Sequence, residues 1–198
     1  MKALVRLELT LVGALMLTGP SPSPALAQDH GGHPPTAQRP QTAEEKQRTG
    51  ALVRIVKDAT ERFSDVRVAQ AEGYNLLFGC VSGGDYGAMG LHYVNMPLVL
   101  DGEINATRPE IVIYEPLANG QVRLVGADYL VFADAWDKTH SSAPELMGQK
   151  FQQFEAPNRF GLPRFYTLHV WAWKDNPTGT FVNWHSNISC DAFSGETQ

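Results

Sequence analysis

Two histidines lie in stretches whose neighbours are mostly apolar or aromatic. His92 is in GLHYVN, just after a glycine-rich loop, and His169 is at the centre of FYTLHVWAW. We expect both stretches to be strands of a mostly antiparallel sheet, in which the two imidazoles could face each other. Imidazole is a good ligand for zinc and copper, and a carboxylate would complete a His₂-carboxylate site.

The third ligand of such a site would come from an acidic residue elsewhere in the chain. Glu115 and Glu103 are the preferred candidates, and Glu110 and Asp101 are the alternatives. The motif is weak, because no two of these residues have a diagnostic spacing such as that of H-E-x-x-H. The sequence therefore predicts where a zinc or copper ion would bind if the protein holds one.

A structural role for His169 competes with the metal site. The residue shares its strand face with Thr167 and Trp171, and the alternate positions of the strand are also apolar, so we expect the strand to be covered on both sides. A buried imidazole needs partners for both ring nitrogens, and a carboxylate or a backbone carbonyl would suffice. A hydrogen-bonded core histidine is thus the leading interpretation, followed by a metal ligand and then by an acid–base catalyst.

The N-terminal region offers a separate metal hypothesis. Residues 1–27 have the pattern of a secretory signal peptide, with Lys2 and Arg6 before an apolar stretch and Ala25-Leu26-Ala27 as the cleavage site. Cleavage there would place His30 third in the mature chain, where an amine, two backbone nitrogens and an imidazole can chelate copper. Cyclisation of the new N-terminal glutamine would remove that amine.

Export agrees with the use of cysteine. The chain has two cysteines, Cys80 and Cys190, and in an exported protein such a pair predicts a disulfide. The formal net charge is −5, and no run of Lys or Arg is present, so nucleic acids and anionic membranes are poor candidates for partners. The sequence leaves the oligomeric state open.

The periodicity of the apolar residues predicts one α+β domain over 43–198, after a Pro/Gly-rich disordered linker over 28–42. Thr42 and Glu45 have the spacing of a capping box, and a second short helix follows with Ser64 as its N-cap. We expect these N-terminal helices to pack on a mostly antiparallel sheet. Strands are predicted around 74–81, 91–95, 111–115, 121–132 and 165–173, and an inserted helix over 144–154.

The glycine-rich loop GCVSGGDYGAMG does not match a known catalytic motif. It lacks G-x-x-x-x-G-K-[ST], which makes a phosphate cradle unlikely to be its role, and Ser82 is not in a G-x-S-x-G elbow. We expect its glycines to let the backbone turn sharply beside a pocket or beside the disulfide.

Several phrases of the chain resemble a family of exported bacterial proteins to which no reaction is assigned. These phrases are ATERFSDVRVAQAEGY, GAMGLHYVN, RPEIVIYEP and NRFGLPRFYTLHVWAWKDNPTG, and a final SC; together they span about 59–190. The resemblance implies a secreted bacterial domain. Members of that family carry Trp-Asn-Pro where this chain has Trp184-His185-Ser186, so the resemblance does not support His185 as part of a shared site.

Three functions remain open from the sequence. The first is an exported domain that binds a small ligand or a divalent metal near His92 and His169. The second is a hydrolase or lyase that uses one of these histidines as a general base. The third is a non-catalytic module of the cell envelope, which would expose a contiguous apolar patch.

Overall fold

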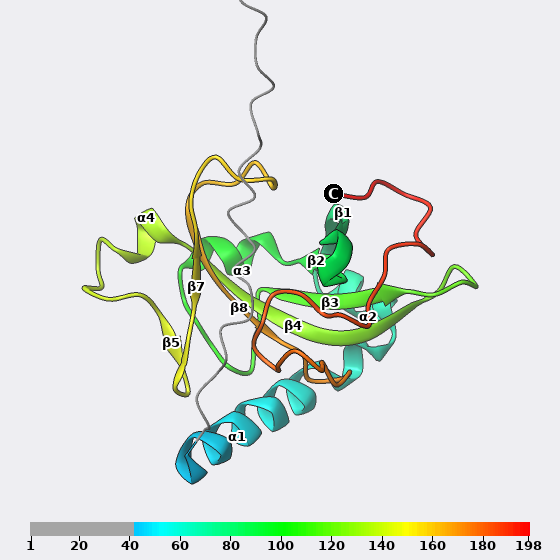
Figure 1. Cartoon of the computed structure of the whole chain (residues 1–198). Coiled ribbons are helices and arrows are strands. Elements are labelled where there is room, and N and C mark those ends of the chain that lie inside the picture. Colours follow the sequence, from blue (N-terminus) through cyan, green and yellow to red (C-terminus); the bar gives the residue numbers. More distant parts are fainter. Residues whose placement is uncertain (1–41) are drawn as a thin grey trace, which may run out of the picture.

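The computed structural model describes residues 42–198. The expected signal peptide, nearly all of the expected linker and the His30 chelate fall on residues 1–41, outside this range. The described chain forms a curled antiparallel sheet with a few helices (Figure 1), which agrees with the predicted α+β class. No helix among the described residues is long and apolar enough to cross a bilayer.

Two helices and a short 3₁₀ turn precede the sheet. They are α1 (Ala43–Thr60), η1 (Glu61–Ser64) and α2 (Val66–Ala71). The predicted capping box is present at the start of α1, where Thr42 Oγ1 accepts from Glu45 N at 3.2 Å and Thr42 N donates to the Glu45 carboxylate at 2.7 Å. The N-cap of α2 is Asp65, not Ser64, because the Asp65 carboxylate accepts the free amide of Arg67.

Six strands form the main sheet, in the order β1-β2-β3-β4-β8-β7, and every neighbouring pair is antiparallel. The strands are β1 (Asn75–Ser82), β2 (Ala88–Val94), β3 (Ile111–Pro116), β4 (Val122–Phe132), β7 (Gln152–Phe154) and β8 (Phe165–Val170). Three short helices lie between them: η2 (Gly84–Tyr86), α3 (Met96–Asp101) and α4 (Ala133–Trp136). Figure 1 shows β3 and the long strand β4 between β7 and β8 at one end and β1 and β2 at the other.

The inserted helix predicted over 144–154 is wrong. These residues form a small hairpin, β5 (Glu145–Leu146) and β6 (Gln149–Lys150), followed by β7. The two residues between β5 and β6, Met147 and Gly148, both have positive φ angles, of 49° and 85°. Such a pair makes a two-residue hairpin turn and ends any helix, so the apolar spacing that suggested a helix was coincidental.

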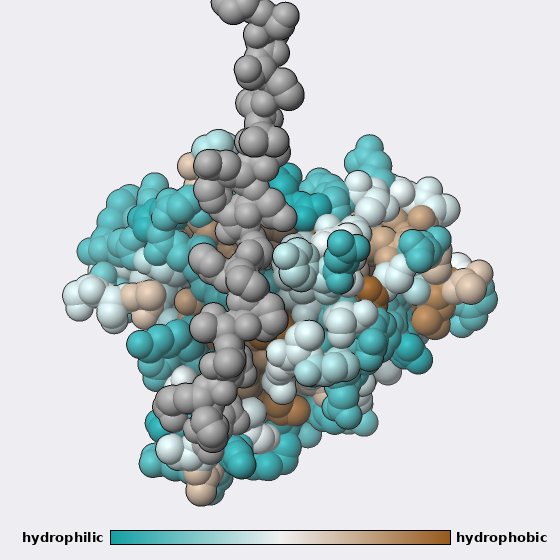
Figure 2. Space-filling model, viewed as in Figure 1, coloured by the Kyte–Doolittle hydropathy of each residue, from teal (hydrophilic) through white to brown (hydrophobic). Residues whose placement is uncertain are grey.

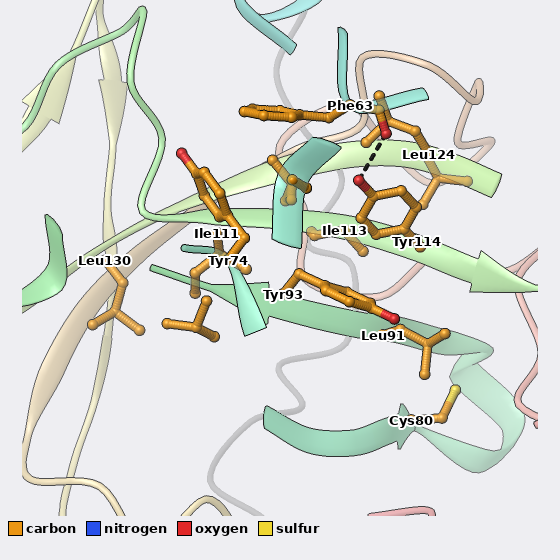
Figure 3. Close-up of a cluster of buried hydrophobic side chains, with 14 of the residues drawn as sticks. Phe63, Tyr74, Cys80, Leu91, Tyr93, Ile111, Ile113, Tyr114, Leu124 and Leu130 are labelled. Atoms are coloured by element: carbon orange, nitrogen blue, oxygen red, sulfur yellow. Dashed lines mark hydrogen bonds between the residues drawn. The ribbon is translucent and has the colours of Figure 1, made fainter. Parts of the chain in front are cut away.

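The two faces of the sheet contribute to different sets of contacts. Leu52 and Val56 of α1 belong to a buried cluster with Tyr129 of β4 and with Leu168 and Val170 of β8. Nearer β2 and β3, the hydroxyl of Tyr114 donates to the backbone oxygen of Phe63 at 2.7 Å (Figure 3). Alternate side chains of β4 and β8 point away from α1, to the other face of the sheet. They include Asp128 and His169.

A disulfide ties the C-terminal segment to β1. Cys80 and Cys190 are bonded, as predicted, and close a loop with a sequence separation of 110. The same segment forms backbone hydrogen bonds to β1, from Cys80 N to Glu196 O and from Gln198 N to Cys80 O, both at 2.9 Å. Gly79 (φ 63°) permits this approach, because a Cβ there would lie 1.9 Å from Glu196 O.

Candidate metal centre

His92, Asp128 and His169 come together inside the curl of the sheet. They lie on β2, β4 and β8, and each offers a ligand atom within 4.8 Å of the others. In a flat sheet β2 and β8 would be about 14 Å apart, which is three strand spacings, so curvature is what brings the two imidazoles together. The three residues are 5%, 2% and 3% exposed, in chain order.

The cross-strand register explains why these side chains share a face. Asp128 is directly opposite His169 on β8 and opposite Ile111 on β3. Val94 is opposite Ile111, and His92 is two residues before Val94 on the same face of β2. Residues opposite each other in an antiparallel pair point to the same side, so the sheet places all three polar groups on its inner face.

The Nε2 atoms of His92 and His169 lie 3.4 Å apart. Two imidazole nitrogens bound to one tetrahedral zinc, each at about 2.0–2.1 Å from the metal, would be separated by roughly 3.3–3.4 Å. The observed spacing is thus the one that a shared ion requires. It is also compatible with a long hydrogen bond between the two rings, provided that one Nε2 carries a proton.

The partners of the two rings restrict their tautomers. His92 Nδ1 lies 3.3 Å from Gly90 O, which can only accept, so the proton of neutral His92 is on Nδ1 and the lone pair of Nε2 faces His169. His169 Nδ1 lies 3.6 Å from Asp128 Oδ1 and makes no hydrogen bond, although it is buried. A metal-bound histidine commonly has its second nitrogen fixed in the way that Gly90 fixes His92.

Neither tautomer of neutral His169 satisfies the cluster. With its proton on Nδ1, two Nε2 lone pairs face each other across 3.4 Å. With its proton on Nε2, the Nδ1 lone pair faces the Asp128 carboxylate at 3.6 Å. Two additions resolve both conflicts: a metal ion between the two Nε2 atoms, or one more proton on the His169–Asp128 pair, held by either the imidazole or the carboxyl group.

Burial sets the charges of the three groups. It lowers the pKa of His92 to about 4 and that of His169 to about 3, because the desolvated imidazolium is unfavourable. Burial also raises the pKa of Asp128 to about 6, against the opposing effects of His92 and of the hydrogen bond from the Thr167 hydroxyl. Near neutral pH the cluster therefore holds two neutral imidazoles and one carboxylate, the protonation state that binds a metal.

A small, partly open pocket with a cavity volume of about 30 Å³ lies next to the three residues. All six strands of the main sheet contribute to it, and its walls away from His92, Asp128, Thr167 and His169 are apolar. The polar groups are thus gathered in one part of the lining. An ion bound there would have an open position toward this pocket, as in catalytic zinc sites with three protein ligands.

The structure places the acidic residues expected from the sequence elsewhere. Glu115 is buried and pairs with Arg123 and Lys174, and Glu103 is exposed. Glu110 is buried, with its carboxylate accepting the amide of Leu130 at 3.1 Å, and Asp101 pairs with Arg108. The described residues that meet as a possible ligand set include none of these four.

Asp128 was not among the ligands expected from the sequence. A signal was present, because this aspartate interrupts an otherwise apolar strand, VGADYLVF, on the face that also carries Leu130. A carboxylate on a buried face needs a partner. His185, the departure from the family phrase, is buried outside the cluster, with its ring edge-on to Trp171 at 5.0 Å.

Comparison with protein families, with curated proteins and with solved structures finds no match to this chain. The resemblance to exported bacterial proteins therefore stays a prediction that rests on the quoted phrases.

Proposed function

We propose that this protein binds one divalent transition-metal ion through His92, His169 and Asp128. The observation that supports the proposal most is the pair of Nε2 atoms at 3.4 Å beside a buried carboxylate, an arrangement in which neutral rings leave two acceptors in conflict. Two imidazoles and a carboxylate suit zinc and copper, the metals expected from the sequence. We also propose that the chain is exported, since its disulfide fits an oxidising compartment.

Catalysis by a histidine base has less support. A general base works best when its pKa is close to the operating pH, whereas burial holds the pKa values of His92 and His169 far below neutrality. The envelope-module alternative also lacks a specific observation in its favour. Among the described residues, the large hydrophobic side chains that are exposed are Tyr86 and Leu100, and Figure 2 shows hydrophobic patches separated by hydrophilic residues on the face in view.

Zinc titration of the chelator-treated protein tests the proposal. The background is a His30→Ala variant of the full chain, which removes the separate N-terminal chelate. We expect one zinc ion per chain, with an affinity that falls roughly 100-fold in His92→Gln and in His169→Gln, because each change removes a ligand. The matched controls are His140→Ala, at an exposed position, and His185→Gln, at a buried one outside the cluster.

The affinities can be compared only among variants that are folded. Each variant is used only if its near-UV circular dichroism matches that of the parent protein. Zinc binding that is equally tight in the two cluster variants and in the two controls would contradict the proposal. A parent protein that takes up no zinc and no copper would also contradict the proposal, and one more proton on the His169–Asp128 pair would then resolve the cluster.

A further inference from the structure

Met89 is a buried side chain in the lining of the pocket beside the three polar residues. It is 2% exposed, and it belongs to neither of the two hydrophobic clusters that the described residues form. A thioether sulfur is a soft metal ligand. The lining therefore combines this sulfur with the two imidazoles and the carboxylate of the candidate metal centre.

A β-bulge turns Met89 toward the pocket. In a regular strand, residues three apart point to opposite faces, so Met89 would point away from the side that carries His92. Met89 has no partner in the β1–β2 register, where Gly90 and Ala88 pair with two neighbouring residues of β1. Gly90 permits the bulge, because its φ angle is 83° and a Cβ there would lie 2.5 Å from Tyr114 O. The irregular strand thus lets Met89 and His92 line the same pocket.

The bulge also orients the neighbouring imidazole. The backbone oxygen of Gly90 lies 3.3 Å from His92 Nδ1, and the Nε2 atom of the same ring faces His169. One irregularity in β2 therefore positions a thioether and an imidazole together. Such control of ligand orientation is typical of metal sites.

The size of the pocket limits what the fourth ligand can be. Its cavity volume of about 30 Å³ is room for about one water molecule. The open position of an ion held by His92, His169 and Asp128 would thus be filled by water or by a side chain of the lining. The hydroxyl of Thr167 already donates to Asp128, and the other lining side chains apart from Met89 are hydrocarbon. The lining therefore offers the Met89 sulfur as the further ligand.

The charge of the ligand set favours a monovalent ion. Two neutral imidazoles, one thioether and the Asp128 carboxylate carry a single negative charge, which Cu(I) would neutralise and Zn(II) would exceed. A net charge is costly beside the buried hydrocarbon walls of Leu130, Phe154 and Phe165. Thioether ligands also select Cu(I), and imidazole suits copper as well as zinc.

We propose that Met89 is the fourth ligand of this site and that the site prefers Cu(I) to Zn(II). The inference rests on the proposed metal site and names its ion. Zinc would use the same imidazoles and carboxylate with water in the fourth position, because zinc sites in proteins are built from nitrogen, oxygen and thiolate ligands. Cu(I) would add the thioether.

Competition with bicinchoninate under argon measures the affinity for Cu(I), in the His30→Ala background. The matched variants are Met89→Leu, which keeps an apolar side chain of similar size, and Met96→Leu, at a half-buried methionine of α3 outside the pocket. We expect one Cu(I) per chain in the parent and roughly tenfold weaker binding in Met89→Leu, with no change in Met96→Leu. The affinity for zinc should be the same in all three, because zinc does not use the thioether.

X-ray absorption at the copper edge identifies the sulfur directly. We expect a sulfur ligand beside the imidazole nitrogens in the parent and in Met96→Leu, and none in Met89→Leu. A copper shell without sulfur in the parent itself would overturn the assignment, whether or not Met89→Leu folds.

The outcomes separate this inference from the metal proposal. Cu(I) binding that is as tight in Met89→Leu as in the parent would overturn the inference without affecting the proposed metal site. Zinc that stays bound when equimolar Cu(I) is added to the zinc-loaded parent would overturn the preference in the same way. A parent protein that binds neither zinc nor Cu(I) would overturn both proposals.

Discussion

The Nε2 atoms of His92 and His169 lie 3.4 Å apart, although two other strands separate β2 from β8 in the sheet. The curl of the sheet brings the two rings together, and Asp128 lies beside them at 3.6 Å from His169 Nδ1. The fold thus places two imidazoles and a carboxylate, a set that could hold a metal ion, at a pocket whose other walls are apolar.

Zinc should stabilise the protein against unfolding. The ligands converge only in the folded chain, so a metal that binds them adds its binding free energy to folding. With free zinc at 100 times its dissociation constant, the free energy of unfolding should rise by about 2.7 kcal/mol. Urea unfolding with and without zinc measures this difference, and an unchanged midpoint in both the parent and the His169→Gln variant would contradict it.

Asp128→Asn should preserve the stability of the metal-free protein but weaken its binding of zinc. In the metal-free protein it replaces a buried carboxylate by a neutral group of the same shape, and the oxygen can still accept from Thr167, so stability should be no lower than that of the parent. With zinc, the loss of the negative ligand should weaken binding by roughly 10–100-fold. Urea unfolding of the metal-free variant tests its stability, and zinc titration tests its affinity. A large loss of stability without metal would show that Asp128 is paired with a charged His169.

Glu110 should make the stability of the protein depend on pH. Burial raises the pKa of Glu110 to about 8, above its value in the unfolded chain. The folded state therefore holds a proton that the unfolded state has released, and the stabilisation from this group is complete below about pH 4.5 and lost as the pH rises toward 8.

The comparison that isolates this effect is with Glu110→Gln, which keeps an oxygen for the amide of Leu130. Between about pH 5 and 7.5 the free energy of unfolding of the parent should fall relative to that of the variant by up to about 1.4 kcal/mol per pH unit, the limit for one proton. Urea unfolding at several pH values measures the two slopes. Parallel slopes would mean that Glu110 is ionised in the folded protein.

Removal of the disulfide should lower the stability of the protein. For a loop with a sequence separation of 110, the chain-entropy estimate for Cys80→Ser with Cys190→Ser is a loss of about 4–5 kcal/mol. Urea unfolding of the parent and of the double variant measures this difference, and equal free energies of unfolding would contradict the estimate.

The strands and the disulfide could be predicted from the sequence, because alternation of apolar residues and the pairing of two cysteines are local or compositional signals. That His92 and His169 face each other was an open hypothesis from the sequence, and the structure brings the two rings together. The helix over 144–154 was mistaken, because a two-residue turn at Met147 and Gly148 outweighs helical spacing.

Asp128 could not be chosen from the sequence over Glu115 and Glu103. The choice depends on the register between β4 and β8, which places Asp128 opposite His169, and on a register shift between Ile113 and Tyr114 in the β3–β4 pair. Glu115 lies on the far side of that shift and pairs with Arg123 and Lys174. Register and curvature arise from contacts distant in sequence, so neither can be obtained from local patterns.

X-ray absorption at the zinc edge, on zinc-loaded protein after gel filtration, tests whether His92, His169 and Asp128 bind the ion. We expect two imidazole nitrogens at about 2.0–2.1 Å and one carboxylate oxygen at about 2.0–2.2 Å, with the imidazole signal halved in His92→Gln. A shell of oxygen ligands alone, or a protein that emerges from the column without zinc, would contradict it.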